Sequence, residues 1–400
     1  MKPSQRHLVL FSRRGWISLS AALLCACSTP LPPPEKEAAS ASASSAASAA
    51  VPAANAQVEA IATAEITPQV LSAPGDADSY SGRDDARALA RDIAQTHELD
   101  EAWVWSALSA ARYKSQAARL MMPAPRGTAK NWGAYRSRFI EPIRIRAGMA
   151  FWQQYQAELQ RAQAQYGVPA EIIAGVIGVE TIYGRYTGNF RVLDVLTTLS
   201  LDFPSGRSDR SPFFKKELGA FLKLCAEQQL VPDAVLGSYA GAIGWPQFMP
   251  SSIRRWGVDF DGDGRVDLQR SPVDAIGSVA HYLAEHGWRT GQPTHFDVTP
   301  PQDDDARAKL LAPDIVPSFS AEEMRALGAL LPDAATQHSG LLALVLLENG
   351  DAAPTLIAGT QNFYAITRYN QSSYYALAVI ELGQAVSQTT QATAGSSDNP

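Results

Sequence analysis

One carboxylic acid of this 400-residue chain, Glu180, falls within an apolar helical stretch at residues 169–184. Four apolar residues precede it by eight, seven, four and three positions and so share its helical face: Ile172, Ile173, Val176 and Ile177. Burial raises the pKa of a carboxyl group, and the negative end of the helix, capped near Gly184, acts in the same direction. A carboxyl group that stays protonated near neutral pH can donate its proton to the leaving oxygen of a glycosidic bond.

A structural role for Glu180 is the alternative, because a buried carboxylate can pair with a guanidinium such as that of Arg185 or Arg191. Most glycosidases also need a second carboxylate that stabilises or attacks the anomeric carbon. Asp194 and Asp202 follow along the chain, but neither lies in a comparable apolar run. If Glu180 cleaves a glycosidic bond, we therefore expect it to work without a second carboxyl group.

A second cluster is the glycine-rich segment at residues 237–252. Its three glycines and two prolines leave little side-chain bulk, so that a sugar chain could approach the backbone closely. The side chains that could hold a saccharide by ring stacking or hydrogen bonds are Ser238, Tyr239, Trp245, Gln247 and Phe248. A tight structural turn produces a similar pattern.

A third cluster, at residues 259–267, follows the spacing of an EF-hand calcium loop. Gly264 stands at the turn position, Arg265 follows at the position that supplies a backbone carbonyl, and the carboxylates are those of Asp259, Asp261, Asp263 and Asp267. Arg270 stands where a bidentate Glu is usual, and Asp274 of the next helix could complete the shell. We expect Ca²⁺ to brace the fold here; a calcium-free, Asp-rich turn is the alternative.

Several tyrosines gather around Asn370 in the segment at residues 364–375, directly before an apolar helix. Tyrosine offers both a flat apolar face and a hydroxyl group. The segment therefore suits either core packing with polar tips or a groove that binds saccharides.

Helical periodicity dominates the chain from residue 83 onward. The predicted helices cover residues 83–96, 100–114 with Asp100 as the N-cap, one or two helices within 139–166, and 192–199, 212–227, 272–285 and 364–385. An apolar run at residues 340–347 turns at 349–351 and returns at 355–358, which predicts a β-hairpin. The fold class is thus mainly α (α+β), with a helical N-terminal domain at 82–148, a catalytic core at 149–290, an inserted β subdomain at 291–362, a helical return to the core at 363–387 and a disordered tail at 388–400.

The first 26 residues are typical of a lipoprotein signal peptide, with four basic residues before an apolar run. Leu24-Cys25-Ala26-Cys27 resembles a lipobox, in which Cys27 would carry the acyl chains. Ser28 favours the outer over the inner membrane, and Arg13-Arg14 leaves twin-arginine export open beside the general route. The Ala-, Ser- and Pro-rich residues 27–81 then predict a disordered tether.

Charge and cysteine content exclude two other features. The formal net charge is −6, and removal of the signal's four cations leaves −10, which argues against a nucleic-acid partner. After the signal peptide and Cys27, Cys225 is the only thiol, so no intrachain disulfide is expected in an oxidising periplasm.

Taken together and in this order, these segments resemble the membrane-bound lytic murein transglycosylase B family, glycoside hydrolase family 103. The resemblance spans roughly residues 83–386 and rests on residues 167–181, 247–252, 259–267, 272–280 and 362–370. It implies a goose-type-lysozyme-like core, a helical N-terminal domain, a small β domain and an EF-hand-like calcium site. It also implies nonhydrolytic cleavage of the β-1,4 bond between N-acetylmuramic acid (MurNAc) and N-acetylglucosamine (GlcNAc) in peptidoglycan, which leaves 1,6-anhydroMurNAc.

The same resemblance assigns roles to single residues. Glu180 would be the sole acid and base, Ser238 would hydrogen-bond near its carboxyl group, and Gln247 would contact the sugar. The residues expected to line the cleft are Tyr135, Tyr282, Asn370 and Tyr375. Residues 243–246, Ile-Gly-Trp-Pro, depart from the Met-Gly-Tyr-Gly of many members and could alter one sugar subsite. The implied partners are peptidoglycan strands and the outer membrane, with peptidoglycan synthases as possible further ones.

Two other functions fit the same residues. In a hydrolytic lysozyme-type muramidase, water would attack in place of the sugar 6-hydroxyl. In a non-catalytic peptidoglycan-binding lipoprotein, the groove alone would be kept. A pure binder has little use for a desolvated acid, which counts against the second alternative.

Overall fold

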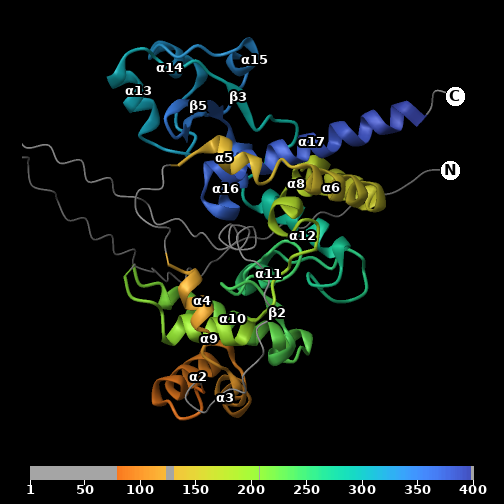
Figure 1. Ribbon diagram of the computed structural model, residues 1–400, viewed down its shortest axis with the longest axis vertical. Coiled ribbons are helices and arrows are strands. Elements are labelled where there is room, and N and C mark those ends of the chain that lie inside the picture. Colours follow the sequence, from red (N-terminus) through yellow and green to blue (C-terminus); the bar gives the residue numbers. More distant parts are fainter. Residues whose placement is uncertain (1–78, 123–129, 207, 398–400) are drawn as a thin grey trace, which may run out of the picture. The chain divides into compact units, whose positions relative to one another are not determined.

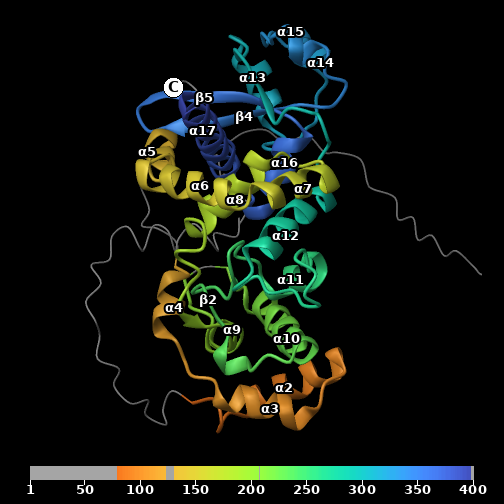
Figure 2. The same cartoon turned by 90° about the vertical axis from the view of Figure 1, so that its right-hand side faces the viewer.

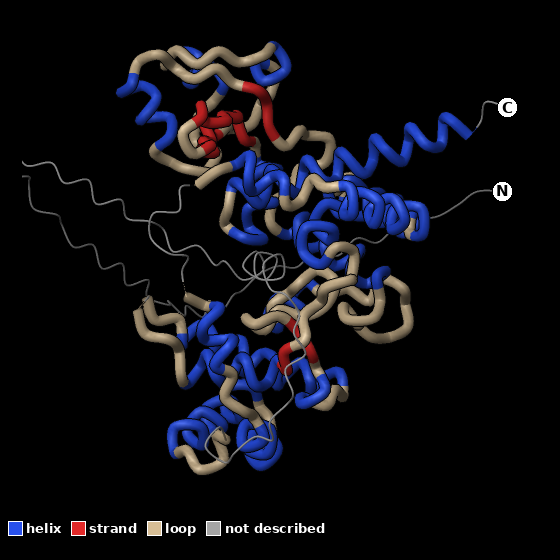
Figure 3. Tube along the Cα trace, viewed as in Figure 1, coloured by secondary structure: helices blue, strands red, loops and turns tan. Residues whose placement is uncertain are grey.

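The computed structural model describes residues 79–122, 130–206 and 208–397, so the predicted signal peptide, Cys27 and most of the tether fall outside them. Most of the described residues are helical (Figure 3). The helices are α2 Asp84–His97, α3 Glu101–Ala110, α4 Ser115–Leu120, α5 Trp132–Ser137, α6 Pro142–Gln154, α7 Gln156–Tyr166, α8 Ala170–Thr181, α9 Val192–Leu201, α10 Ser211–Gln228, η2 Pro232–Ala234, α11 Pro250–Trp256, α12 Pro272–Glu285, α13 Asp304–Leu311, α14 Ala321–Ala326, α15 Asp333–Thr336, α16 Gln361–Asn370 and α17 Ser373–Ser397. The strands are β1 Phe190–Arg191, β2 Leu236–Gly237, β3 His295–Asp297, β4 Ala343–Asn349 and β5 Ala352–Gly359. None of the helices in these three ranges combines the length and the apolar character of a membrane span.

Helix α8, which carries Glu180, is enclosed by other helices. Helix α17 packs along it, and α6, α7 and α12 also pack against it (Figures 1 and 2). Two glycines allow α8 and α17 to approach closely. A Cβ atom on Gly175 would lie 2.2 Å from the Val379 carbonyl oxygen, and one on Gly383 would lie 2.0 Å from that of Glu171. The apolar sequence of α8 is thus buried on nearly all sides, as expected for a helix without a polar face.

The predicted boundary between an N-terminal domain and the core is wrong, because residue 148 lies inside α6. Helices α2 and α3 pack together (Figure 2), and α2 packs against α10, while α3 and α4 pack against α9. By contrast, α5 and α6 pack against α17. The five helices α2 to α6 therefore belong to two different packing groups. The side chain of Asp100 caps α3 as predicted, but α3 ends at Ala110 rather than residue 114.

The last three residues of the predicted tether, 79–81, are part of the described structure and contact the helices. Ser79 forms a β-bridge with Arg112, and Tyr80 is buried. The Tyr80 hydroxyl donates a hydrogen bond to Asp202 at 2.7 Å. A large aromatic ring with a satisfied hydroxyl contributes enough burial to order this end of the segment.

The predicted β-hairpin is confirmed as β4 and β5, although β5 starts at Ala352. The two strands are antiparallel, and β3 pairs with the other edge of β5 to give the order β3-β5-β4. Gly350 has a φ of 63°, which suits the turn. The subdomain has its own small cluster of buried apolar side chains, including Leu310, Met324 and Leu344. The fold is therefore mainly helical with small antiparallel sheets.

The C-terminal part differs from the prediction in two ways. The single helix expected at residues 364–385 is two helices, α16 and α17, because Gln371 adopts a left-handed conformation with φ of 43° between them. The tail expected to be disordered from residue 388 continues α17 as far as Ser397. Threonine hydroxyls in this part donate to carbonyl groups one turn earlier, as from Thr389 to Ala385 at 2.6 Å, which satisfies polar groups of a helix end with little apolar burial.

Candidate active site

Glu180 occupies the last turn of α8, and only 5% of its surface is exposed. Its Oε1 accepts a hydrogen bond from the Tyr375 hydroxyl at 2.7 Å. Its Oε2 has no hydrogen-bond partner among the described residues. One oxygen is therefore held in place by α17, and the other is left to carry a proton.

Burial raises the pKa of Glu180 to about 8, while the hydrogen bond from Tyr375 and the nearby cation of Arg144 act in the opposite direction. The carboxyl group is thus protonated at neutral pH, as the apolar stretch predicts. The structural alternative does not hold in this structure. Arg185 is exposed, and Arg191 forms ion pairs with Asp194 and Asp233 instead.

The chain leaves α8 through a strained turn directly after Glu180. The prediction that Gly184 caps the helix is wrong, since the C-cap is Ile182 with φ of 50°. Tyr183 and Gly184 continue in the left-handed region, with φ of 54° and 79°. This conformation is unfavourable for a β-branched residue such as Ile182. The Thr181 hydroxyl holds the turn by donating to the Trp245 carbonyl at 3.0 Å and accepting from the Gly184 N–H at 3.0 Å.

The glycine-rich segment folds as a tight turn, the alternative that its sequence left open. Ile243 and Phe248 form an antiparallel bridge, and a Cβ atom on Gly237 would lie 2.3 Å from the Ala242 carbonyl oxygen. Tyr239 and Phe248 belong to the core and do not offer free ring faces to a sugar. Trp245 is partly exposed and packs near Phe151, with a 6.0 Å distance between ring centroids.

Ser238 and Gln247 are engaged by this turn. The Ser238 hydroxyl accepts the Ala242 N–H at 3.0 Å, and the implied hydrogen bond near Glu180 is not formed in this structure. The Gln247 amide donates to the carbonyl groups of Gly244 at 2.8 Å and Thr187 at 3.1 Å. Gln247 also has a φ of 49°, a left-handed conformation that costs free energy. Direct contact of either residue with a sugar stays a prediction.

Three tyrosines from three helices form a row of ring contacts that starts at Tyr375, the residue bound to Glu180. The rings of Tyr375 (α17) and Tyr369 (α16) stack at 5.9 Å, and the Tyr282 ring (α12) lies 4.9 Å from that of Tyr369. Their hydroxyls are oriented by hydrogen bonds, since Tyr369 donates to the Pro246 carbonyl at 2.6 Å and Tyr282 to the Arg368 carbonyl at 2.9 Å. The tyrosine-rich segment therefore contributes to core packing and supplies the partner of Glu180, while its contact with a saccharide stays a prediction.

Two further residues were expected to line the cleft, Asn370 and Tyr135. Asn370 ends α16, is 7% exposed, and its Nδ2 has no partner among the described residues. Tyr135 of α5 contacts Tyr374, the neighbour of Tyr375, with 5.8 Å between ring centroids. Two residues near Glu180 were missed: Tyr369, which no pattern distinguishes from its neighbouring tyrosines, and Arg144, which lies on a helix without any motif.

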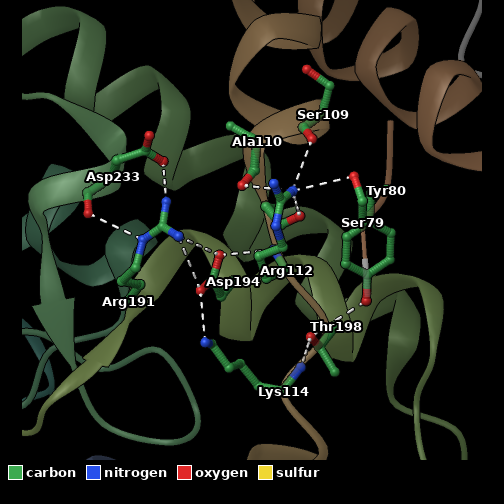
Figure 4. Close-up of polar contacts among 11 residues, drawn as sticks. Ser79, Tyr80, Ser109, Ala110, Arg112, Lys114, Arg191, Asp194, Thr198 and Asp233 are labelled. Carbon is green, nitrogen blue, oxygen red and sulfur yellow. Dashed lines mark hydrogen bonds and ion pairs between the residues drawn. The ribbon is translucent and has the colours of Figure 1, made fainter. Parts of the chain in front are cut away.

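The two later carboxylates considered as partners for Glu180 have structural roles. Asp194 is fully buried, and Figure 4 shows Lys114, Arg191 and the backbone of Arg112 converging on it. Lys114 Nζ lies 3.2 Å away, Arg191 Nη1 lies 3.4 Å away, and the Arg112 N–H donates at 2.9 Å. Asp202 binds Arg83 at 2.7 Å. Neither carboxylate is available for catalysis beside Glu180.

The Asp-rich loop fits a hard divalent cation. Asp259, Asp261 and Asp263 each place one carboxylate oxygen within 4.8 Å of the others. Gly264 has the φ of 91° that the sharp turn needs. Three carboxylate oxygens around such a turn suit Ca²⁺ rather than a transition metal.

Asp274 of α12 supports the Asp-rich loop through hydrogen bonds. Its buried carboxylate accepts the backbone N–H groups of Phe260 at 2.8 Å, Asp261 at 3.2 Å and Asp267 at 2.8 Å. In this structure Asp274 therefore braces both ends of the loop through backbone donors, and its place in the metal shell stays a prediction. The predicted carbonyl ligand of Arg265 stays a prediction.

The fold and this site place the chain in the family described as Transglycosylase SLT domain, which matches residues 81–384. The chain belongs to this family. It is 38% identical over 315 residues to the membrane-bound lytic murein transglycosylase B of Escherichia coli (strain K12), which covers 77% of this chain and 84% of that protein.

Solved structures of lytic transglycosylases have the same fold. Catenated SltB1 from Pseudomonas aeruginosa has a TM-score of 0.71 and 39% identity over 78% of this chain and 99% of that chain. Escherichia coli Slt35 in complex with calcium has a TM-score of 0.66 and 36% identity over 82% and 99%. SltB3 from Pseudomonas aeruginosa in complex with NAG-anhNAM-pentapeptide has a TM-score of 0.63 and 29% identity over 76% and 79%.

Proposed function

We propose that this protein is a lytic murein transglycosylase that cleaves the β-1,4 bond between MurNAc and GlcNAc in peptidoglycan and forms 1,6-anhydroMurNAc ends. The observation that carries this proposal is the environment of Glu180: a buried carboxyl group with one oxygen held by Tyr375, the other without a partner among the described residues, and a pKa of about 8. Membership of the transglycosylase family supports it. So does the complex of the relative SltB3 with an anhydro-muropeptide.

The reaction needs one group that acts first as an acid and then as a base. Protonated Glu180 donates its proton to the glycosidic oxygen, the bond from MurNAc C1 to that oxygen breaks, and GlcNAc leaves with a 4-hydroxyl. The MurNAc 2-acetamido oxygen bonds to C1 and stabilises its positive charge, a substrate-assisted course that replaces a second carboxylate. Ionised Glu180 then takes the proton of the 6-hydroxyl, whose oxygen bonds to C1 as the acetamido group leaves. No water is consumed.

Mass spectrometry of muropeptides released from purified peptidoglycan tests this proposal. We expect the new MurNAc ends to be anhydro ends. Reducing ends heavier by one water would instead identify a hydrolytic muramidase, and the absence of any released fragment would identify a non-catalytic binding protein.

The rate of cleavage should fall as pH rises through about 8, because Glu180 must be protonated to donate its proton. In Tyr375→Phe the carboxylate loses the hydrogen bond that stabilises it, so the pKa of Glu180 rises and the decline should move to higher pH. The measurement is kcat/KM as a function of pH for both proteins. An alkaline decline at the same pH in both would show that Tyr375 does not control this ionisation.

We also propose that Asp259, Asp261 and Asp263 hold a structural Ca²⁺, as the calcium complex of the relative Slt35 supports. Calcium at about a hundredfold excess over its Kd would stabilise the fold by about 3 kcal/mol. EDTA should therefore lower the Tm by several degrees, and Asp263→Asn should remove most of this response. The same Tm with and without EDTA in the unaltered protein would contradict a bound calcium brace.

The protein is further proposed to be a lipoprotein at the periplasmic face of the outer membrane, anchored through Cys27. The lipobox-like sequence and the membrane-bound name of the Escherichia coli relative support this location. Acyl chains on one cysteine each contribute about 0.8 kcal/mol per buried CH₂ group. Metabolic labelling with palmitate should mark the unaltered chain and not Cys27→Ser. Equal labelling of both would refute the anchor.

A further inference from the structure

Arg144 is a buried cation beside the last turn of α8, which carries Glu180. The reaction described above gives Arg144 no role. It lies on α6 and is 2% exposed. Its Nη1 donates to the carbonyl oxygen of Gly178 at 2.7 Å and to that of Val179 at 3.2 Å. These are the two residues that directly precede Glu180 on α8. The guanidinium is therefore fixed to the backbone that carries the catalytic side chain.

The guanidinium of Arg144 lies in apolar surroundings, where its loss of hydration costs free energy. Its Cζ lies 5.0 Å from the centroid of the Phe139 ring, and burial lowers its pKa. The carboxyl groups that act on it electrostatically are those of Glu141, at the N-cap of α6, and Glu180. A buried guanidinium is usually retained where its planar set of donors satisfies several acceptors at once. Here Nη1 reaches two carbonyl groups in the last turn of α8, while Nε has no hydrogen-bond partner among the described residues.

A cation at this position changes the electrostatics of the helix end. The carbonyl groups at the C-terminus of a helix form the negative end of its dipole, which disfavours a nearby carboxylate. Arg144 binds two of those carbonyl groups and so offsets their negative potential beside Glu180. Burial favours the neutral form of Glu180, whereas Arg144 favours its ionised form.

We propose that Arg144 is a positioning residue of the transglycosylase reaction, which fixes the last turn of α8 and stabilises Glu180 as a carboxylate between its two proton transfers. This inference rests on the proposed function, because only an acid that later acts as a base must be stable in both forms. The loss of Arg144 should slow proton donation, since the carboxylate that forms in that step loses its nearest cation.

The other groups that face Glu180 are not charged at neutral pH. Tyr375 of α17 hydrogen-bonds to it, and Tyr369 of α16 interacts with it electrostatically. Tyr282 of α12 interacts electrostatically with Tyr369. Tyr183, which follows α8, interacts electrostatically with Arg144. Helix α7 also packs against α8 but contributes no group that shifts the pKa of Glu180. A change in the pH profile on removal of Arg144 can therefore be assigned to this one cation.

The experiment compares the full-length unaltered chain with Arg144→Met, Arg144→Lys and a matched control, Arg161→Met. Arg161 has the same pair of contacts elsewhere, since it donates to the Phe260 carbonyl at 2.7 Å and lies 3.9 Å from the Phe260 ring centroid. Release of anhydro-muropeptides is measured as kcat and as kcat/KM against pH, with Tm recorded for each protein.

We expect kcat of Arg144→Met to fall about tenfold, less than the roughly 10²–10³-fold loss for a donor that touches the reacting atoms. Its alkaline decline should move to higher pH, because the pKa of Glu180 rises without the cation. Arg144→Lys keeps the charge. Compared with Arg144→Met, its alkaline decline should lie closer to the original pH, and it should recover only part of the lost kcat. Arg161→Met should match the unaltered chain in both.

Two results for Arg144→Met would overturn the proposal. One is an unchanged kcat. The other is a reduced kcat with an unshifted alkaline decline and a Tm lowered in proportion, which would indicate a loss of stability alone. If Arg144→Met does not fold, Arg144→Gln, which keeps hydrogen-bond donors without the charge, takes its place, and an unchanged kcat with an unshifted alkaline decline in that protein overturns the proposal. Absence of anhydro-muropeptides from the unaltered chain would remove the proposed function and this inference together. Normal release by the unaltered chain with silent Arg144 variants would remove this inference only.

Discussion

Glu180→Gln should reduce the release of anhydro-muropeptides by about 10²–10⁴-fold, the usual contribution of a general acid–base group. Glutamine has nearly the same shape and can still accept the hydrogen bond from Tyr375, but it has no acidic proton to donate. Because Glu180 is itself neutral at pH 7, the substitution should leave the Tm at that pH almost unchanged. The assay is quantitative chromatography of muropeptides at fixed protein concentration.

Glu171→Gln is the matched control for this substitution. Glu171 lies on the same helix, nine residues before Glu180, and is partly exposed. Its loss should not change the yield of anhydro ends. If Glu180→Gln released as many anhydro ends as Glu171→Gln, Glu180 would not be the catalytic acid.

Asp194→Ala should lower the free energy of unfolding by about 2–3 kcal/mol, because a backbone N–H loses its acceptor and two partly exposed cations lose their counter-charge. Asp194 is fully buried and holds Lys114 and Arg191 together with the Arg112 N–H, as Figure 4 shows. Without it, two partly exposed cations lose their buried counter-charge, and the loop before α4 keeps only part of its attachment to α9, such as the hydrogen bond from the Lys114 N–H to the Thr198 hydroxyl at 3.0 Å. Urea unfolding followed by circular dichroism measures the loss.

A matched control for Asp194 is Glu227→Ala, which removes an exposed ion pair with Arg254 at 2.9 Å. Pairs at the surface contribute less than about 1 kcal/mol. Asp194→Asn should fall between the two, because the amide oxygen can still accept the Arg112 N–H. Equal losses for Asp194→Ala and Glu227→Ala would show that burial does not strengthen the Asp194 contacts.

Local patterns predicted the parts of the fold that depend on local chemistry. The Asp100 cap and the β4–β5 hairpin follow from short signals of known meaning, and both are confirmed. The break at Gln371 and the left-handed C-cap at Ile182 could not be predicted, because the intrinsic preferences of those residues oppose what tertiary packing imposes. The domain boundary at residue 148 failed for a related reason, since α6 packs against helices that come much later in the chain. The likeness of the core to goose-type lysozyme stays a prediction.

Site residues that belong to one local sequence motif could be predicted. Contacts between segments that are far apart in the sequence could not. Glu180 was singled out by its own apolar helix, and the Asp-rich loop by its spacing. The resemblance placed Tyr375 only in the lining of the cleft, and its hydrogen bond to Glu180 was not predicted, because two residues 195 positions apart share no local pattern. For the same reason Arg144 gave no signal: its role arises only where α6 crosses the end of α8.

The separation of Glu180 and Tyr375 by 195 positions also means that the acidity of Glu180 is a property of the assembled chain rather than of its helix. Until α17 docks, the face of α8 that carries this carboxyl group lacks its main cover, and an uncovered glutamate has an ordinary pKa and is ionised at neutral pH. A partly folded molecule is therefore expected to be inactive, since its Glu180 side chain lacks the proton that it must donate.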